Sequence, residues 1–126
     1  MVRVIGFDHL VLRSSDVERA LAFYCDELGL EPVRTDEWRR GEVPFPSVRV
    51  DESTIMDVLE GVRDGTNVDH LCLVLAPTDL AALAASGRFD VVGDGAIDGL
   101  FGAQGYATSL YVRDPDGNVV ELRSYD

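Results

Sequence analysis

The sequence is poor in the features that mark several common classes of protein. It has two cysteines, Cys25 and Cys72, in 126 residues. That is too few for a disulfide framework, and they lack the Cys-x-x-Cys spacing of a zinc or redox pair. No apolar run approaches the ~20 residues that span a bilayer, and the first residues lack the apolar stretch of a secretory signal. We therefore expect a cytoplasmic protein with reduced thiols and no membrane partner.

Basic residues are also scarce, with 11 Lys and Arg against 23 Asp and Glu and a formal net charge of −12. Phosphate binding needs a basic surface, so this composition argues against a nucleic-acid partner. The acidic excess either serves solubility or attracts a cationic ligand. Five glycines lie within 93–105, but neither GxxxxGK[ST] nor GxGxxG occurs. We read this segment as a flexible loop or lid.

What the chain does contain is an internal repeat. The motif DHLVL that begins at Asp8 returns as DHLCL at Asp69, 61 residues later. Each copy is followed by a helix-capping signal and then by a stretch rich in alanine and leucine. Each half closes with an apolar strand that carries one carboxylate, Asp57 in the first half and Glu121 in the second. A duplicated unit predicts equivalent side chains meeting about a pseudo-twofold axis.

Periodicity and turn signals give the order β-α-β-β-β twice. Alternating and apolar runs predict strands over 4–12, 31–34, 47–50, 54–59, 68–75, 89–92, 108–113 and 118–123. Helical spacing predicts helices over 17–28 and 79–86, ended by Gly29 and Gly87. Loops or turns are predicted over 39–46 and 114–117.

One βαβββ unit cannot bury its own sheet well. We therefore predict an α+β fold in which paired βαβββ modules form an eight-stranded curved sheet, a cup with the helices outside. The whole chain, 1–126, is expected to be one domain. Its first module is about 1–60, its linker 61–67, and its second module about 68–126.

The candidate site residues all fall on one face of the predicted strands. Side chains alternate across a strand, which places His9, His70, Asp57 and Glu121 on the mixed face that would line the cup. The same rule points four further residues inward as candidate substrate contacts: Arg49, Ser109, Tyr111 and Arg113.

The two histidines are the only ones in the chain, and both occupy the same repeat position. Two imidazoles and two carboxylates are a plausible divalent-metal site. Asp57 is the weaker ligand candidate, because its side chain is one methylene shorter than that of glutamate. A strand histidine is also often structural, and Glu121 has an alternative partner in Arg113 or Arg123.

The sequence resembles the vicinal oxygen chelate superfamily, the glyoxalase/bleomycin-resistance/dioxygenase group. The resemblance rests on FDHLVL at Phe7, on AFY and LGL in the first helix region, and on SLYVRDPDGNVVEL from Ser109. It implies a metal bound between paired modules, with His9, His70 and Glu121 as ligands. It places Asp57 where glyoxalase I has a fourth ligand, usually glutamate.

Two functions follow as hypotheses. In the first, a divalent ion (Zn, Ni, Mn or Fe) binds two adjacent oxygens of a small substrate and stabilises an enolate or other oxyanion. Asp57 or Glu121 would act as the base, and Arg49 and Arg113 would favour an anionic substrate. The alternative is a metal-free binding protein of the bleomycin-resistance type. The acidic charge and Trp38, read as lying in a loop, suit that alternative.

A homodimer is also expected. A single pair of modules leaves sheet edges open, and an open edge invites pairing with a second copy. The apolar pair Leu100-Phe101 in the glycine-rich segment is a candidate for the dimer contact or for a lid over the cup.

Overall fold

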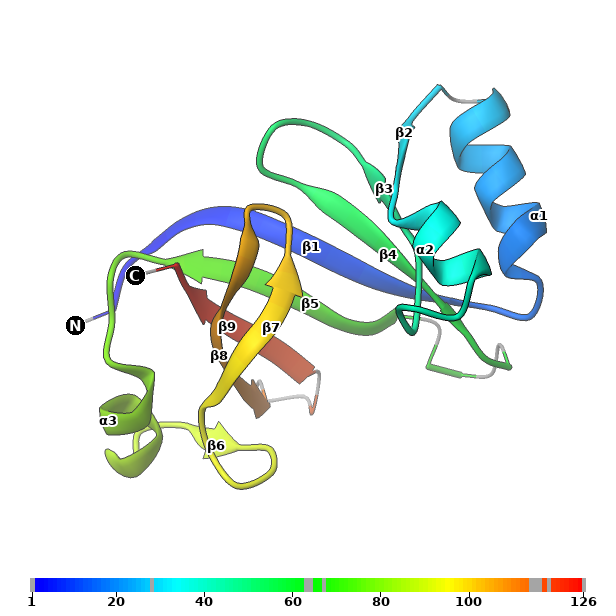
Figure 1. The fold of residues 1–126 in the computed structure, drawn as a ribbon. Coiled ribbons are helices and arrows are strands. Elements are labelled where there is room, and N and C mark those ends of the chain that lie inside the picture. The colour runs from blue at the N-terminus through cyan, green and yellow to red at the C-terminus, as the bar shows by residue number, and fades with distance from the viewer. Residues whose placement is uncertain are drawn as a thin grey trace. The chain divides into compact units, whose positions relative to one another are not determined.

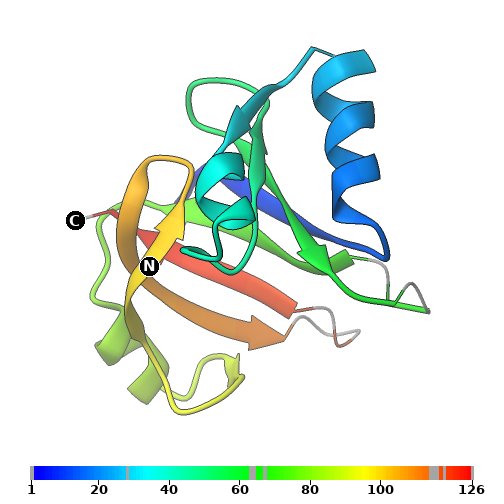
Figure 2. The same ribbon diagram turned by 45° about the vertical axis from the view of Figure 1, so that its right-hand side comes forward.

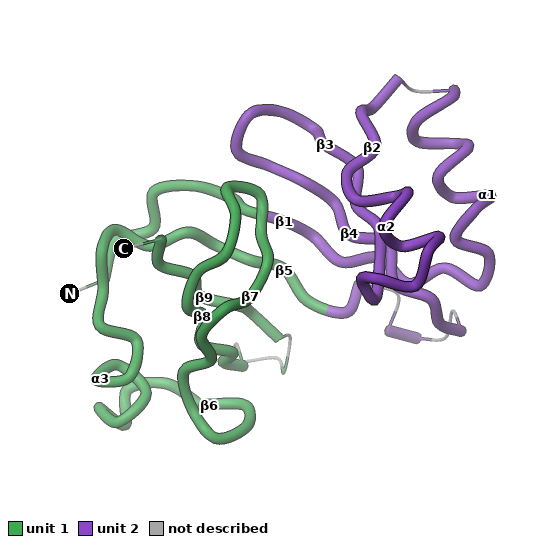
Figure 3. Tube along the Cα trace, viewed as in Figure 1, with its two compact units in different colours: residues 1–8, 70–126 green, residues 9–69 purple. Residues whose placement is uncertain are grey.

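The computed structural model describes residues 2–27, 29–62, 65–66, 68–113, 117 and 119–125 (Figure 1). Two compact units make up the chain (Figure 3). Unit 1 comprises Met1–Asp8 and His70–Asp126, and unit 2 comprises His9–Asp69. The chain thus leaves unit 1 between Asp8 and His9 and returns between Asp69 and His70. Each histidine is the first residue after a crossing.

Unit 2 contains a four-stranded part of the sheet in the order β2-β3-β4-β1. Strand β1 (Val4–Ser14) begins in unit 1 and continues into unit 2, where it pairs in parallel with β4 (Ile55–Glu60). Strands β2 (Glu31–Val33) and β3 (Ser47–Arg49) follow as antiparallel neighbours. The predicted strands of the first half are confirmed.

The first helix of unit 2 begins and ends where the sequence indicates. Asp16 caps α1 (Val17–Leu21) by accepting a hydrogen bond from the Arg19 amide at 3.1 Å. The helix continues as one stretch of π-helix, η1 (Ala22–Glu27). Gly29, with φ +79°, donates its N–H to the Cys25 carbonyl and ends it. Only glycine adopts this conformation without strain.

A second short helix, α2 (Thr35–Arg39), was not predicted. It carries Trp38, which packs against the core made by Val17, Leu21, Val48 and Val58. The reading of Trp38 as a loop residue is therefore wrong. Local sequence signals did not predict this helix, because packing of the Trp38 indole against residues outside the helix holds it in place. An ion pair joins the two helices, with Nη2 of Arg39 in α2 2.8 Å from Oε1 of Glu18 in α1.

Unit 1 contains the sheet order β1-β5-β9-β8-β6, with β7 on the outside of β8. Strands β5 (Val68–Leu75) and β9 (Val119–Ser124) are parallel, and β8 (Gly105–Arg113) and β9 are antiparallel. Helix α3 (Leu80–Ala85) is capped by Asp79, and β6 is Asp90–Val91. The core of this unit is formed by Leu75, Leu80, Leu83, Leu110, Val112 and Leu122.

The glycine-rich segment 93–105 is not a flexible loop, and that prediction is wrong. It contains strand β7 (Ile97–Gly102), which forms a hairpin with β8 (Figures 1 and 2). Gly99 (φ +73°) lies where the β7 register shifts, and Gly105 (φ +104°) follows the turn. The glycines serve a bulge and a tight turn, conformations that other residues adopt at a cost.

The α+β class is confirmed, with nine strands in the described part of the chain. The extra strand is β7. The predicted turn at 114–117 and linker 61–67 fall partly outside the described residues: 63, 64, 67 and 114–116. In the part of the chain that the structure covers, no helix is long and apolar enough to cross a bilayer.

Candidate metal centre

In unit 1, the structure brings His70 and Glu121 together. The Nε2 atom of His70 lies 3.1 Å from Oε1 of Glu121, and the Glu121 side chain is 1% exposed. The parallel pairing of β5 and β9 places Cys72 opposite Glu121. His70 lies two residues before Cys72 on β5. A pair made of a partly buried imidazole and a buried carboxylate is suited to binding a cation or moving a proton.

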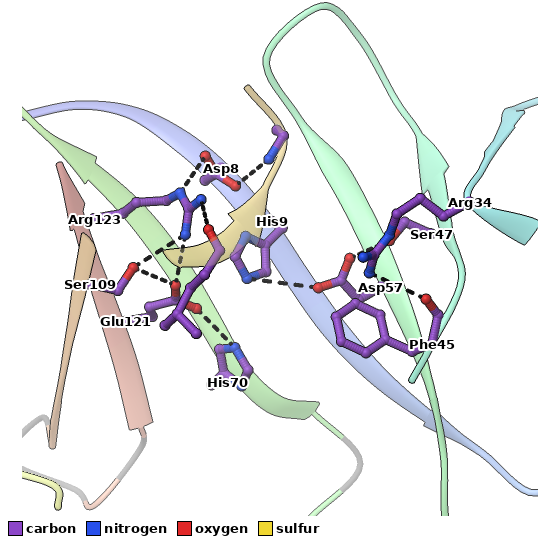
Figure 4. Close-up of polar contacts among 12 residues, drawn as sticks. Asp8, His9, Arg34, Phe45, Ser47, Asp57, His70, Ser109, Glu121 and Arg123 are labelled. Carbon is purple, nitrogen blue, oxygen red and sulfur yellow. Dashed lines mark hydrogen bonds and ion pairs between the residues drawn. The ribbon is translucent and has the colours of Figure 1, made fainter. Parts of the chain in front are cut away.

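The second oxygen of Glu121 is held by two groups. Ser109 donates its hydroxyl to Oε2 at 2.7 Å, and Nη1 of Arg123 lies 3.4 Å from the same atom. Arg123 also donates to Oγ of Ser109 at 3.2 Å. We call these four residues (His70, Ser109, Glu121 and Arg123) the unit 1 cluster (Figure 4). Ser109, predicted to contact substrate, here orients the carboxylate.

Arg123 is fully buried and was not among the predicted site residues. Strand alternation had placed it on the face of Glu121, and that was the signal available in the sequence. Burial by itself would lower the pKa of Arg123, but Tyr125, Asp8 and Glu121 together raise it above its ordinary value. The guanidinium is therefore a permanent cation inside unit 1.

Tyr111 lies beside the unit 1 cluster. Its ring meets the His70 ring edge to face, with 5.3 Å between centroids. Burial, and then the charge and hydrogen bond of Glu121, raise the pKa of Tyr111 well above its ordinary value. The phenol is therefore protonated at neutral pH and acts as a hydrogen-bond donor.

In unit 2, the structure brings His9 and Asp57 together. Nε2 of His9 lies 3.8 Å from Oδ2 of Asp57, and both side chains are buried. Ser47 donates its hydroxyl to Oδ1 of Asp57 at 2.6 Å, because β3 and β4 pair these two residues directly. His9, Ser47 and Asp57 form the unit 2 cluster (Figure 4).

Arg34 lies near the unit 2 cluster in Figure 4. It has a left-handed backbone, with φ +59°, a conformation that is uncommon outside glycine. Its Nη2 donates to the Phe45 carbonyl at 3.3 Å, and its guanidinium lies over the Phe45 ring. Sequence reasoning gave no sign of this residue.

The two clusters are built alike. In each, a serine on the preceding strand donates to one carboxylate oxygen, and a histidine lies close to the other. Glu121 additionally has Arg123, whereas the equivalent position in unit 2 is Leu59. The internal repeat therefore extends to the residues that orient the carboxylates.

The two remaining candidate contacts are engaged elsewhere. Nη1 of Arg49 donates to the carbonyls of Asp51 and Glu52. Arg113 lies near the end of β8, is exposed, and pairs with Asp90 at 3.4 Å. A role for either arginine in binding substrate stays a prediction.

A model of the Glyoxalase/Bleomycin resistance protein/Dioxygenase superfamily matches residues 6–122. The chain belongs to this superfamily. Its paired sequence repeat and α+β fold are those that the resemblance of its motifs had implied.

The individual proteins that this chain resembles are distant from it in sequence. Virulence protein STM3117 of Salmonella typhimurium is 26% identical over 121 residues, which cover 94% of this chain and 83% of that protein. Methylmalonyl-CoA epimerase from Mycobacterium tuberculosis has a TM-score of 0.63 at 16% identity, covering 98% of this chain and 89% of its own.

The 2,3-dioxygenase LapB from Pseudomonas sp. KL28 has a TM-score of 0.69 at 16% identity, over 97% of this chain and 41% of its own. At such identities, the likeness to these solved structures establishes the fold and no more.

The donor chemistry of both clusters fits a divalent metal ion. Each offers one imidazole nitrogen and one carboxylate oxygen, which are ligands that zinc and other first-row ions accept. In each, a serine hydroxyl holds the second carboxylate oxygen, as the supporting groups of metal ligands commonly do.

Proposed function

We propose that this superfamily member is a divalent-metal-dependent enzyme acting on a small substrate that offers two adjacent oxygens. His9, His70 and Glu121 would bind the ion, and Asp57 would be a fourth ligand or a base. The observation that carries the proposal is the pair of equivalent clusters, each with a buried carboxylate oriented by a serine toward a histidine.

The charges within unit 1 support a cation at this place. Asp8 and Glu121 are both buried carboxylates, and the buried cation between them is Arg123. Burying a charge without compensation is costly. A metal ion held by His70 and Oε1 of Glu121 would add positive charge beside these buried carboxylates.

The two histidines occupy equivalent places along the chain. Both histidines follow directly on a crossing between the units, and both crossings fall at the same place in the repeated motif. His9 is covalently next to Asp8, which belongs to unit 1 and accepts a hydrogen bond from the Ala103 amide at 2.9 Å.

A bound divalent ion would supply Lewis-acid polarisation of the two substrate oxygens. The protein's own groups would do the rest. Asp57 or Glu121 would accept a proton from the substrate, and the protonated Tyr111 would donate a hydrogen bond to a substrate oxygen. Arg49 and Arg113 would attract an anionic group on the substrate.

The test is metal analysis of the protein purified without chelator. We expect about one Zn, Ni, Mn or Fe ion per chain, as a single shared centre requires. His9→Ala, His70→Ala and Glu121→Gln should each lose it. Glu60→Gln, which changes an exposed strand carboxylate, is the matched control and should keep the ion. A wild-type protein that binds none of the four metals at micromolar concentration contradicts the proposal.

The family description and the net charge of −12 also favour a second function. Metal analysis tests this function as well. A metal-free binding protein of the bleomycin-resistance type would bind a cationic drug tightly without any ion. Its affinity would be unchanged in His70→Ala, because such a protein has no need of the imidazole.

A further inference from the structure

Arg123 makes more polar contacts than are needed to compensate the charge of one buried carboxylate. Its Nη2 donates to the carbonyls of Leu100 at 2.5 Å and Gly105 at 2.6 Å. Its Nη1 reaches Ser109 and Glu121, and its Nε lies 3.7 Å from Oδ2 of Asp8. The ring of Tyr125 lies beneath the guanidinium, 4.8 Å from Cζ.

The two carbonyls belong to opposite strands of the β7-β8 hairpin. Leu100 lies in β7 and Gly105 begins β8, so one nitrogen of Arg123 joins both arms of the hairpin near its turn. The turn itself is tied to β1, because the Ala103 amide donates to Asp8. A guanidinium is planar, and it cannot rotate without breaking both carbonyl bonds.

The backbone leaves no spare room around this group. A Cβ added at Gly102 would lie 2.6 Å from Cζ and from Nε of Arg123. Gly102 has no positive φ, so its conformation alone does not require glycine. The close approach to Arg123 is what makes a side chain unfavourable at this position.

We infer that Arg123 is a positioning residue that fixes Glu121 in one orientation, with Oε2 held and Oε1 turned to His70. The inference rests on the proposed function. Glu121 would then be a fixed metal ligand, because Ser109 and an immobile guanidinium both hold its Oε2 atom. The role of proton acceptor then falls to Asp57, which has Leu59 where Glu121 has Arg123.

Gly102→Ala tests this without removing any charged or ligating group. The new methyl group must displace the guanidinium, whereas Gly65→Ala is the matched control, with no atom within 4 Å of its added Cβ. Both variants are titrated with Co²⁺ in the full chain, and the affinity and the visible d–d spectrum are recorded. Thermal unfolding of the metal-free proteins monitors the fold.

We expect Gly102→Ala to weaken Co²⁺ binding about tenfold, the lower end of the effect of removing a group that orients a metal ligand. Its visible spectrum should also change, which a loss of stability alone would not produce. Gly65→Ala should match the wild type in both. Arg123→Lys keeps the charge but lacks the planar fork, so it should also bind Co²⁺ more weakly.

Wild-type affinity and spectrum in a folded Gly102→Ala would overturn the inference and leave the proposed function standing. If Arg123→Lys does not fold, Gly102→Ala still decides the point. A wild-type protein that binds no Co²⁺ would overturn the proposed function and this inference together.

Discussion

At the scale of single residues, hydroxyl groups decide how the buried carboxylates are presented. Ser47 and Ser109 are both fully buried, and each gives its proton to one carboxylate oxygen. A carboxylate with one oxygen held in this way offers the other in a defined direction. Tyr125 likewise donates its hydroxyl to one oxygen of Asp8, and the Ala103 amide donates to the other.

Tyr125 gives the protein a measurable response to alkali. Burial, and then the hydrogen bond to Asp8, raise the pKa of Tyr125 from 10.0 to about 12. A group whose pKa is raised on folding stabilises the fold fully below its unfolded pKa. This contribution is therefore present below pH 10 and is lost as the pH rises through about 12.

We predict that Tyr125→Phe removes this late ionisation from the phenolate absorbance titration of the folded protein. The variant should also unfold with less dependence on pH above 10. Tyr106→Phe, which changes an exposed tyrosine, is the control. A titration in which Tyr125→Phe removes only ionisation near pH 10 would contradict the prediction.

At the scale of elements, local signals set the beginnings of helices. Asp16 and Asp79 precede α1 and α3, and each accepts a backbone N–H three residues ahead. Both caps were readable in the sequence because the interaction is local. Helix α2 has no such cap. Arg34 precedes it and makes no side-chain capping hydrogen bond, so no capping residue was available to predict this helix.

We predict that Asp16→Ala and Asp79→Ala each lower the free energy of unfolding by about 1 kcal/mol, the usual value of such a cap. Urea denaturation at neutral pH measures the change. Asp94→Ala, at an exposed position with no helix to cap, should leave the midpoint unchanged. An equal loss in all three variants would mean that charge, and not capping, is responsible.

At the scale of the whole molecule, unit 1 has apolar side chains left at its surface. Val4, Ile5 and Phe7, near the start of β1, are exposed apolar residues, and Tyr106 is exposed on the β7-β8 hairpin. The hairpin turn is held to β1 through Ala103 and Asp8, so the turn of the hairpin lies next to the part of β1 that contains Phe7. Exposed apolar clusters mark interfaces.

We predict a homodimer that buries this region, measured by sedimentation at micromolar concentration. Ile5→Asp, at a position 54% exposed, should shift the protein to the monomer. Val62→Asp, 77% exposed and in unit 2, is the control and should leave the dimer intact. A monomeric wild type would refute the prediction. The expected contact at Leu100-Phe101 falls in the same hairpin and is part of this prediction.

The sequence by itself determined the parts that depend on neighbours along the chain. The α+β class, the repeat, the helix caps and most strands follow from periodicity and turn residues within a few positions of one another. The equivalence of the two histidines follows from the repeat alone. These features are local or self-similar, and a single sequence records them.

Only the tertiary structure decided how the carboxylates are held. Arg123 meets Asp8, Leu100 and Gly105, which are far from it in the chain. Trp38 and β7 likewise owe their places to contacts with distant strands. A side chain's partners across a sheet depend on strand pairing and register, and neither is written in the spacing of residues along one strand.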